Sequence, residues 1–207
     1  MSKDTPQSGS LSQSQSPALL GGGNAPHMSD VRTLREHARR HIEGGAVTEG
    51  YGANRDAVLK LLNEALATEL VCVLRYKRHY YMAEGPQSDA AAAEFLEHAK
   101  QEEEHADRIA ARIVQLGGAP DFSPDTLTAR SHAEYVAGNN LVEMIKEDLV
   151  AERIAIDSYR EMALFIGDGD STTRRMLEEI MAVEEEHADD LSSLLAADSS
   201  LARAARG

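Results

Sequence analysis

One hexapeptide occurs twice in this sequence, and the duplication constrains the fold more than any other feature. Each copy of EEEHAD follows a glutamate at nearly equal spacing, 33 and 32 residues, and a tyrosine comes seven residues after that glutamate. Because motif, order and spacing all recur, we expect two copies of one helical pair, related by an approximate two-fold axis. Along the chain the repeated residues are Glu69, Tyr76, Glu102–Asp107, Glu152, Tyr159 and Glu184–Asp189.

Apolar residues with helical spacing predict four long helices, and short links pair them into two antiparallel hairpins. The link from Gly117 to His132 has 16 residues, which can extend over about 50 Å, the length of a bundle. The sequence therefore predicts an all-α four-helix bundle, with two antiparallel hairpins joined by a long crossover. The predicted helices cover Arg55–Ala83, Asp89–Leu116, Ala133–Ile166 (with a kink near Gly138) and Thr172–Ala196 (with Ser171 or Asp170 as N-cap).

Each predicted helix carries a glutamate within its apolar seam. Steps of three and four residues along the first helix give Leu62, Ala65, Glu69, Cys72 and Tyr76, and the other helices repeat the pattern around their own glutamates. A bundle buries this face, so four carboxylates should meet in the core, where desolvation and mutual repulsion would disfavour them. Two divalent metal ions would offset the four negative charges.

Spacing on the second and fourth helices predicts the remaining ligands. Residues three apart share one face of a helix, so the Glu and His of each Glu-x-x-His can bind an ion together. A Glu from each of two helices plus Glu-x-x-His from each of the other two forms a di-metal carboxylate site. Oxygen and imidazole ligands suit iron or manganese better than tetrahedral zinc, and availability favours iron. The predicted metal ligands are Glu69, Glu102, His105, Glu152, Glu184 and His187.

His98 and Cys72 also lie in these apolar seams. His98 lies one turn before Glu102 on the same face, and both an accessory metal ligand and a hydrogen-bonded core histidine fit this position. Cys72 is interpreted as a small buried hydrophobic residue. Because it is the single cysteine, it excludes a disulfide within the chain, a cysteine-only zinc site and a rubredoxin-like site.

The segment from Ala57 to Leu195 resembles a bacterioferritin-type member of the ferritin-like superfamily. The stretches LLNEALATELVCVLRY and EEEHADRIAARIVQLGGAP resemble the first and second helices of the family, and DLVAERIAIDSYREM and EEIMAVEEEHADDL resemble the third and fourth. The resemblance implies a di-iron centre with two terminal glutamates, two bridging glutamates and one histidine on each iron. It also implies that Tyr76 lies beside this centre as a hydrogen-bond or electron donor. In that order the ligands are Glu69 and Glu152, Glu102 and Glu184, and His105 and His187.

The sequence departs from bacterioferritins in two places. The family binds haem through a methionine directly after the first glutamate of the second-helix motif, and Glu103 stands there, so haem is not expected. About a dozen residues follow Leu195, too few for much of the short fifth helix of the family. We therefore expect a homo-oligomeric cage of either 24 subunits or, as in Dps-like miniferritins, 12.

Charge and composition divide the chain into three predicted parts. Residues 1–28, rich in Ser, Gln, Gly and Pro, are interpreted as a disordered extension or a segment added ahead of the natural start. Residues 29–53 are predicted to hold a short helix, Asp30–Glu43, and a linker. Residues 54–207, the predicted bundle, carry 16 basic and 30 acidic residues and so the whole net charge of −14. This acidity disfavours nucleic acid, and no segment suits a membrane span or a signal peptide, so a cytoplasmic location is expected.

The leading functional hypothesis is a ferroxidase that oxidises Fe(II) with O₂ or H₂O₂ and stores Fe(III) in the cage. The same bundle also hosts other chemistry, so a rubrerythrin-like or manganese-catalase-like peroxide-scavenging di-metal protein is one alternative. The single cysteine disfavours rubrerythrin. Oxidation of an organic substrate is another alternative, although the chain is short for the helices that shape such a pocket. A non-catalytic, metal-stabilised assembly protein is the alternative from a different class.

Overall fold

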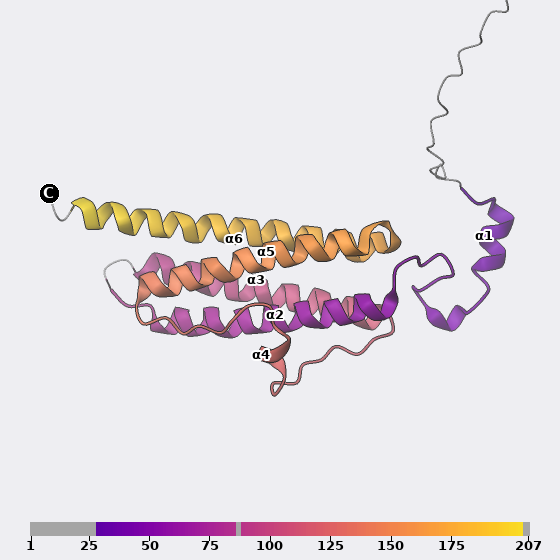
Figure 1. The fold of residues 1–207 in the computed structure, drawn as a ribbon, viewed down its shortest axis with the longest axis horizontal. Coiled ribbons are helices and arrows are strands. Elements are labelled where there is room, and N and C mark those ends of the chain that lie inside the picture. The colour runs from indigo at the N-terminus through magenta and orange to yellow at the C-terminus, as the bar shows by residue number, and fades with distance from the viewer. Residues whose placement is uncertain (1–27, 86–87, 205–207) are drawn as a thin grey trace, which may run out of the picture.

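Four long helices form the body of the protein (Figure 1). The computed structural model describes residues 28–85 and 88–204, and this part of the chain contains helices and no strand. Helices α2 and α3 form one hairpin, and α5 and α6 form the second, which lies alongside the first. The predicted four-helix bundle with two hairpins is thereby confirmed. The long helices are α2 (Arg55–Met82), α3 (Ser88–Gln115), α5 (Leu141–Ile166) and α6 (Ser171–Ala204).

Side-chain caps set the starts of three of these helices. Asn54 accepts a hydrogen bond from the Ala57 N–H at the start of α2. Asp170 accepts one from the Thr173 N–H at the start of α6, as one of the two predicted caps. The predicted start of the third helix at Ala133 is wrong. Asn140 caps α5 through the Glu143 N–H, because Gly138 has a φ of +62° and therefore cannot continue a helix.

Two other predicted helix ends also differ from the structure. Helix α6 continues to Ala204, past the predicted end at Ala196, because neither glycine nor proline interrupts that stretch. The predicted helix Asp30–Glu43 is shorter, since α1 covers Val31–His37. The backbone turns left-handed at His41, with a φ of +48°, before the 3-10 turn η1 (Ile42–Gly44).

The crossover runs along α2 on its way from α3 to α5 (Figure 1). It contains the short helix α4 (Leu127–Arg130). The Asn63 side chain accepts from the Asp121 N–H at 2.8 Å, and the Thr68 hydroxyl accepts from the His132 N–H at 2.9 Å. Polar side chains of α2 therefore hold the crossover along its path between the two hairpins.

A buried ionic network ties α2 to α5 near the end of the crossover. Arg75 Nε donates to Asp148 Oδ1 at 2.7 Å, and His79 Nδ1 lies 2.7 Å from Asp148 Oδ2. Arg75 also donates to the Glu134 carbonyl oxygen at 2.9 Å. The side chains of Arg75, His79 and Asp148 are all buried, so the network holds both the hairpin contact and the crossover in place.

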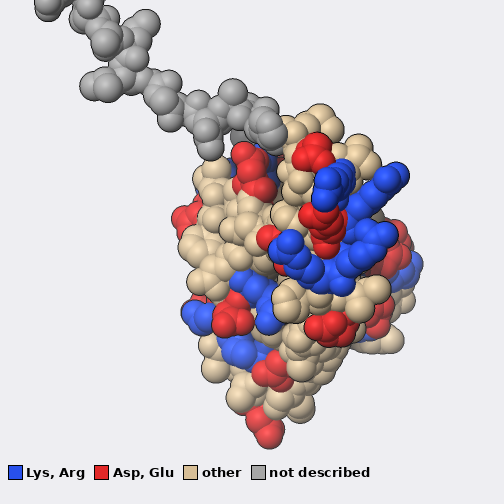
Figure 2. Space-filling model, turned by 90° about the vertical axis from the view of Figure 1, so that its right-hand side faces the viewer, with Lys and Arg blue, Asp and Glu red and all other residues tan. Residues whose placement is uncertain are grey.

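Basic side chains gather at the end of the molecule that carries α1 and are mixed with acidic ones (Figure 2). Within the described residues α1 buries none of its side chains. Arg32 pairs with Glu36 at 3.0 Å, and Arg40 pairs with Glu49 at 3.2 Å. Residues 1–27 of the predicted extension lie outside the described part. In the described part, no helix combines the length and apolar character that a membrane span needs.

Candidate metal centre

Two apolar clusters enclose a polar layer in the middle of the bundle. On α2, Leu62 and Leu66 belong to one cluster, and Cys72 and Tyr76 belong to the other. Glu69 lies between them along the helix and is 1% exposed. The apolar residues on both sides give this layer a low dielectric, which strengthens every charge interaction within it.

The structure brings all six predicted ligand residues together in this layer, each at most 4% exposed. They form two groups of four, and within each group the ligand atoms lie within 4.8 Å of one another. Both groups contain Glu102 and Glu184. Two adjacent metal positions that share two carboxylates fit this arrangement, as in di-metal carboxylate sites. The first group is Glu69, Glu102, His105 and Glu184, and the second is Glu102, Glu152, Glu184 and His187.

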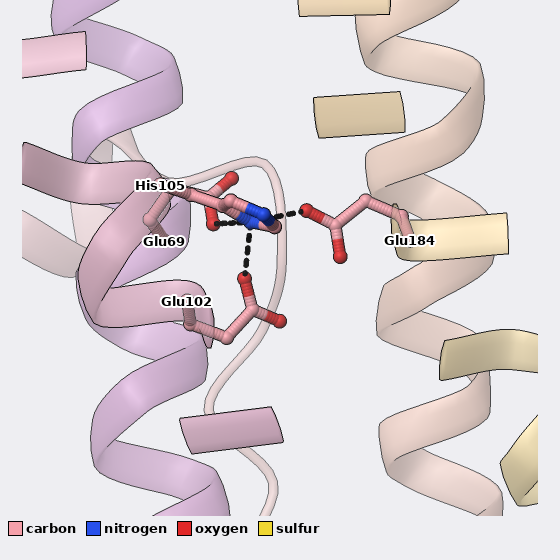
Figure 3. A group of neighbouring side chains, drawn as sticks. All are labelled: Glu69, Glu102, His105 and Glu184. Atoms are coloured by element: carbon pink, nitrogen blue, oxygen red, sulfur yellow. Dashed lines mark ion pairs between the residues drawn. The ribbon is translucent and has the colours of Figure 1, made fainter. Parts of the chain in front are cut away.

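His105 stands at the centre of the first group (Figure 3). Its Nδ1 lies 3.0 Å from Glu184 Oε1, 3.4 Å from Glu69 Oε2 and 3.5 Å from Glu102 Oε2. These three glutamates come from three different helices and point at one ring nitrogen. Atoms that share a metal at about 2.1 Å lie about 3 to 4 Å apart, so the spacing suits common ligation.

His187 holds the corresponding place in the second group. Its Nδ1 lies 3.2 Å from Glu184 Oε2, 3.7 Å from Glu102 Oε1 and 3.9 Å from Glu152 Oε2. Its other ring nitrogen, Nε2, lies 2.6 Å from Gln101 Oε1. An Nε2–H that donates to Gln101 leaves the Nδ1 lone pair free for a metal. Sequence reasoning missed Gln101, which is the residue immediately before the Glu102 motif.

Seven buried atoms of this layer have no hydrogen-bond partner among the described residues. A buried polar atom without a partner costs about 1–3 kcal/mol, so seven in one place need a common explanation. Five are carboxylate oxygens and two are imidazole nitrogens, a donor set that fits iron or manganese. They are Glu69 Oε2, Glu102 Oε1, His105 Nδ1, Glu152 Oε2, both carboxylate oxygens of Glu184 and His187 Nδ1.

Protons compete with metal ions for these ligands. Burial, together with the charges of Glu102 and Glu184, raises the pKa of Glu69 well above its ordinary value, and burial beside Glu102 raises the pKa of Glu152. Burial works to lower the pKa of His105, but the carboxylates of Glu102 and Glu184 raise it to about 9. The carboxylates of Glu152 and Glu184 likewise outweigh burial and raise the pKa of His187 to about 10. The centre therefore holds extra protons near neutral pH.

Metal binding is expected to release protons and to tighten as the pH rises. All four shifts are upward, so the centre stays protonated above the ordinary pKa of each group, and a ligand must lose its proton to bind a metal. Affinity should rise about tenfold per pH unit for each proton displaced. Calorimetric titration with Mn²⁺ at pH 6 and pH 8, in buffers of different ionisation enthalpy, measures the affinity and the number of protons released. An affinity equal at the two pH values would contradict this expectation.

The two repeated tyrosines cross between the hairpins. Tyr76 of α2 donates its hydroxyl hydrogen to Glu152 Oε1 of α5, and Tyr159 of α5 donates to Glu69 Oε1 of α2. Each tyrosine thus orients the glutamate of the other copy, as the approximate two-fold relation predicts. The resemblance to bacterioferritins places Tyr76 alone beside the centre, but Tyr159 makes the equivalent hydrogen bond to the glutamate of the other copy.

The profile of the ferritin-like domain matches residues 59–200 of the chain. The protein belongs to the ferritin-like family. The family match covers both ligand groups and most of both hairpins, so the predicted resemblance is confirmed. Among curated relatives, the bacterioferritin of Mycobacterium avium is 32% identical over 143 residues, covering 67% of this chain and 83% of the relative. That of Brucella melitensis is 30% identical over 139 residues, covering 67% and 82%.

Solved structures of the ferritin-like family superpose on the same bundle. The dodecameric thioferritin of Bacteroides fragilis, a bacterioferritin-related protein, is 30% identical with a TM-score of 0.72 and covers 74% of this chain and 92% of its own. The Dps homologue of the archaeon Halobacterium salinarum is 27% identical with a TM-score of 0.65, covering 68% and 80%. The fold is therefore shared with both bacterioferritin-related and Dps-related proteins.

Proposed function

We propose that this ferritin-like protein oxidises Fe²⁺ and stores the ferric product inside a homo-oligomeric cage. The observation that carries the proposal is the pair of ligand groups that share Glu102 and Glu184. Bacterioferritins at about 30% identity support iron as the metal and storage as the purpose. O₂ and H₂O₂ are the proposed oxidants, and manganese is the alternative metal.

The protein residues hold the two Fe²⁺ substrates side by side. Glu69 and His105 would complete one position, Glu152 and His187 would complete the other, and the two shared glutamates would bridge them. The paired ions together supply two electrons, which reduce O₂ to H₂O₂ or H₂O₂ to water. The apolar clusters on both sides limit the access of water to the reacting ions.

Tyr76 and Tyr159 fix the terminal glutamates through the hydrogen bonds described above. We propose an additional role for Tyr76 as a hydrogen-bond or electron donor, because it contacts Glu152 and also lies 3.3 Å from His98 Nδ1. Haem has no part in the proposal. Glu103 stands where bacterioferritins place the haem-binding methionine, and its carboxylate lies 3.6 Å from Lys77 at the surface.

A cage of 12 subunits is proposed over one of 24. The thioferritin of Bacteroides fragilis, described as dodecameric, is 30% identical to this chain, and the match covers 92% of its length. The formal charge of −14 adds a reason for Fe²⁺ to concentrate at such an assembly, because a strongly acidic protein attracts cations.

Addition of two Fe²⁺ per chain to the metal-free protein, followed by O₂, is expected to give one fast phase of ferric absorbance. Further Fe²⁺ should yield ferric mineral that elutes with the assembled protein in gel filtration, and light scattering should report the mass of the cage. A control with bovine serum albumin at equal concentration separates this product from spontaneous ferric precipitate. A monomeric or dimeric protein from which all ferric product separates would contradict storage.

A further inference from the structure

Glu94, His98 and Asp190 form a second cluster of metal-ligating side chains, outside the four-glutamate centre. His98 Nε2 lies 3.8 Å from Glu94 Oε2 and 3.7 Å from Asp190 Oδ2. One ligand atom from each residue lies within 4.8 Å of the others. Glu94 and His98 are four residues apart on α3, so they share one face of that helix, and Asp190 faces them from α6.

His98 carries the evidence that this cluster takes a ligand. Its side chain is 2% exposed, and Nε2 has no hydrogen-bond partner within the described ranges 28–85 and 88–204. Both carboxylates stand beyond hydrogen-bond distance from this nitrogen, so neither satisfies it. A buried ring nitrogen aimed at two carboxylates without a hydrogen bond to either leaves the space between the three for a cation.

The hydrogen bonds of Tyr76 assign the hydrogen on the His98 ring. The single hydroxyl hydrogen of Tyr76 goes to Glu152, so the tyrosine oxygen accepts at its contact with His98 Nδ1, 3.3 Å away. The ring hydrogen of neutral His98 therefore sits on Nδ1, and Nε2 presents a lone pair. A lone pair and two negative carboxylates repel one another unless a positive charge lies between them.

The sequence repeat does not account for His98. The residue four positions before the second Glu-x-x-His motif is Ile180, a fully buried apolar residue, and it occupies the place that His98 has in the first copy. The first copy therefore departs from the apolar packing of the second at this position. Two carboxylates and one neutral imidazole carry a formal charge of −2, which a divalent cation would balance.

The cluster lies between solvent and the four-glutamate centre. The His98 ring stacks on the His187 ring with 4.0 Å between centroids. The Glu94 and Asp190 side chains are 42% and 56% exposed. A cation held here would contact water on one side, while its imidazole ligand touches a predicted ligand of the centre on the other.

We infer that Glu94, His98 and Asp190 form a third divalent-cation site, which takes Fe²⁺ from solution on its way to the four-glutamate centre. The transit role rests on the proposed function, whereas the cation binding does not. Imidazole and carboxylate donors suit Fe²⁺, Mn²⁺ and Zn²⁺, and the exposed carboxylates let an ion enter and leave. The hydrogen bonds from His98 through Tyr76 to Glu152 connect this site to the centre.

Crystals of the full chain soaked in Mn²⁺ test the binding directly. Anomalous difference density is expected between the three side chains in the parent and is expected to be absent in Asp190→Asn. The control is Asp189→Asn, which removes the same charge from the adjacent exposed residue of α6 and should keep the peak. Manganese peaks confined to the four-glutamate centre in the parent would overturn the site.

Fe²⁺ oxidation by the same variants tests the transit role. Asp190→Asn is expected to raise the Fe²⁺ concentration for half-maximal rate by about tenfold and to leave the maximal rate within twofold of the parent. Asp189→Asn should change neither value. A third manganese peak with an unchanged half-maximal concentration would overturn transit but not binding. A parent that binds three ions and oxidises no iron would overturn the proposed function and the transit role while the site stands.

Discussion

Glu102→Ala is expected to remove both proposed metal positions at once and to slow Fe²⁺ oxidation by about 100-fold or more. Glu102 belongs to both ligand groups, so one substitution weakens the binding of two ions. Glu69 belongs to a single group, and Glu69→Ala should therefore remove one ion and leave the other. Metal content by atomic emission and stopped-flow ferric absorbance measure the two effects.

Loss of folding would not explain that result. Glu102 is buried beside Glu69 and Glu152, and its charge raises the pKa of both neighbours in addition to the effect of burial. Removal of one of these repelling carboxylates should raise the thermal stability of the metal-free protein. A Glu102→Ala protein that melts no lower than the parent but oxidises no iron would therefore locate the defect in the centre.

Two further variants sharpen the test. Glu103→Ala alters the adjacent exposed glutamate and should leave metal content and rate unchanged. Tyr76→Phe removes the hydroxyl that contacts Glu152 and should retain both metals while slowing oxidation. If Glu102→Ala oxidised iron as fast as the parent, the assignment of the centre would be wrong.

Much of the centre could be predicted because helical spacing places ligands without any knowledge of the loops. Glu102 and His105 share a face by their spacing alone, and the second copy of the motif repeats the relation. The start of α5 could not be predicted from periodicity. The residues from Ala133 to Asn140 include apolar ones, but the left-handed Gly138 and the cap at Asn140 delay the helix.

The polar contacts around the centre were beyond sequence reasoning for a different reason. Arg75 and Asp148 are 73 residues apart, and no repeat or motif connects them. Gln101 reaches His187 across 86 residues in the same way. Such pairs depend on how the two hairpins pack, whereas the Glu-x-x-His ligands depend on one helix. A repeated motif or a place in an apolar seam thus made the ligand contacts predictable, even between helices, whereas these two pairs needed the structure.

Asp148→Ala is expected to destabilise the protein by about 3–5 kcal/mol, because it leaves the buried Arg75 guanidinium without its carboxylate. Arg75 and Asp148 are 1% and 0% exposed, and His79 loses the same partner. Unfolding in guanidinium chloride, followed by circular dichroism at one protein concentration, measures the change, since assembly contributes to stability. The matched control is Asp157→Ala, whose partner Arg160 lies on the surface of the same helix, with an expected effect below about 1 kcal/mol.

The double variant Arg75→Met/Asp148→Leu separates the charge from the packing. It removes both ions of the pair and fills the space with apolar side chains, so it should be more stable than Asp148→Ala. Asp148 lies one turn before Glu152, and Arg75 directly precedes Tyr76, so the network also borders the centre. If the double variant recovers stability and binds metal like the parent, the network serves the fold alone. If it recovers stability but loses metal, Asp148 also positions Glu152. An Asp148→Ala protein as stable as the parent would contradict the ionic role.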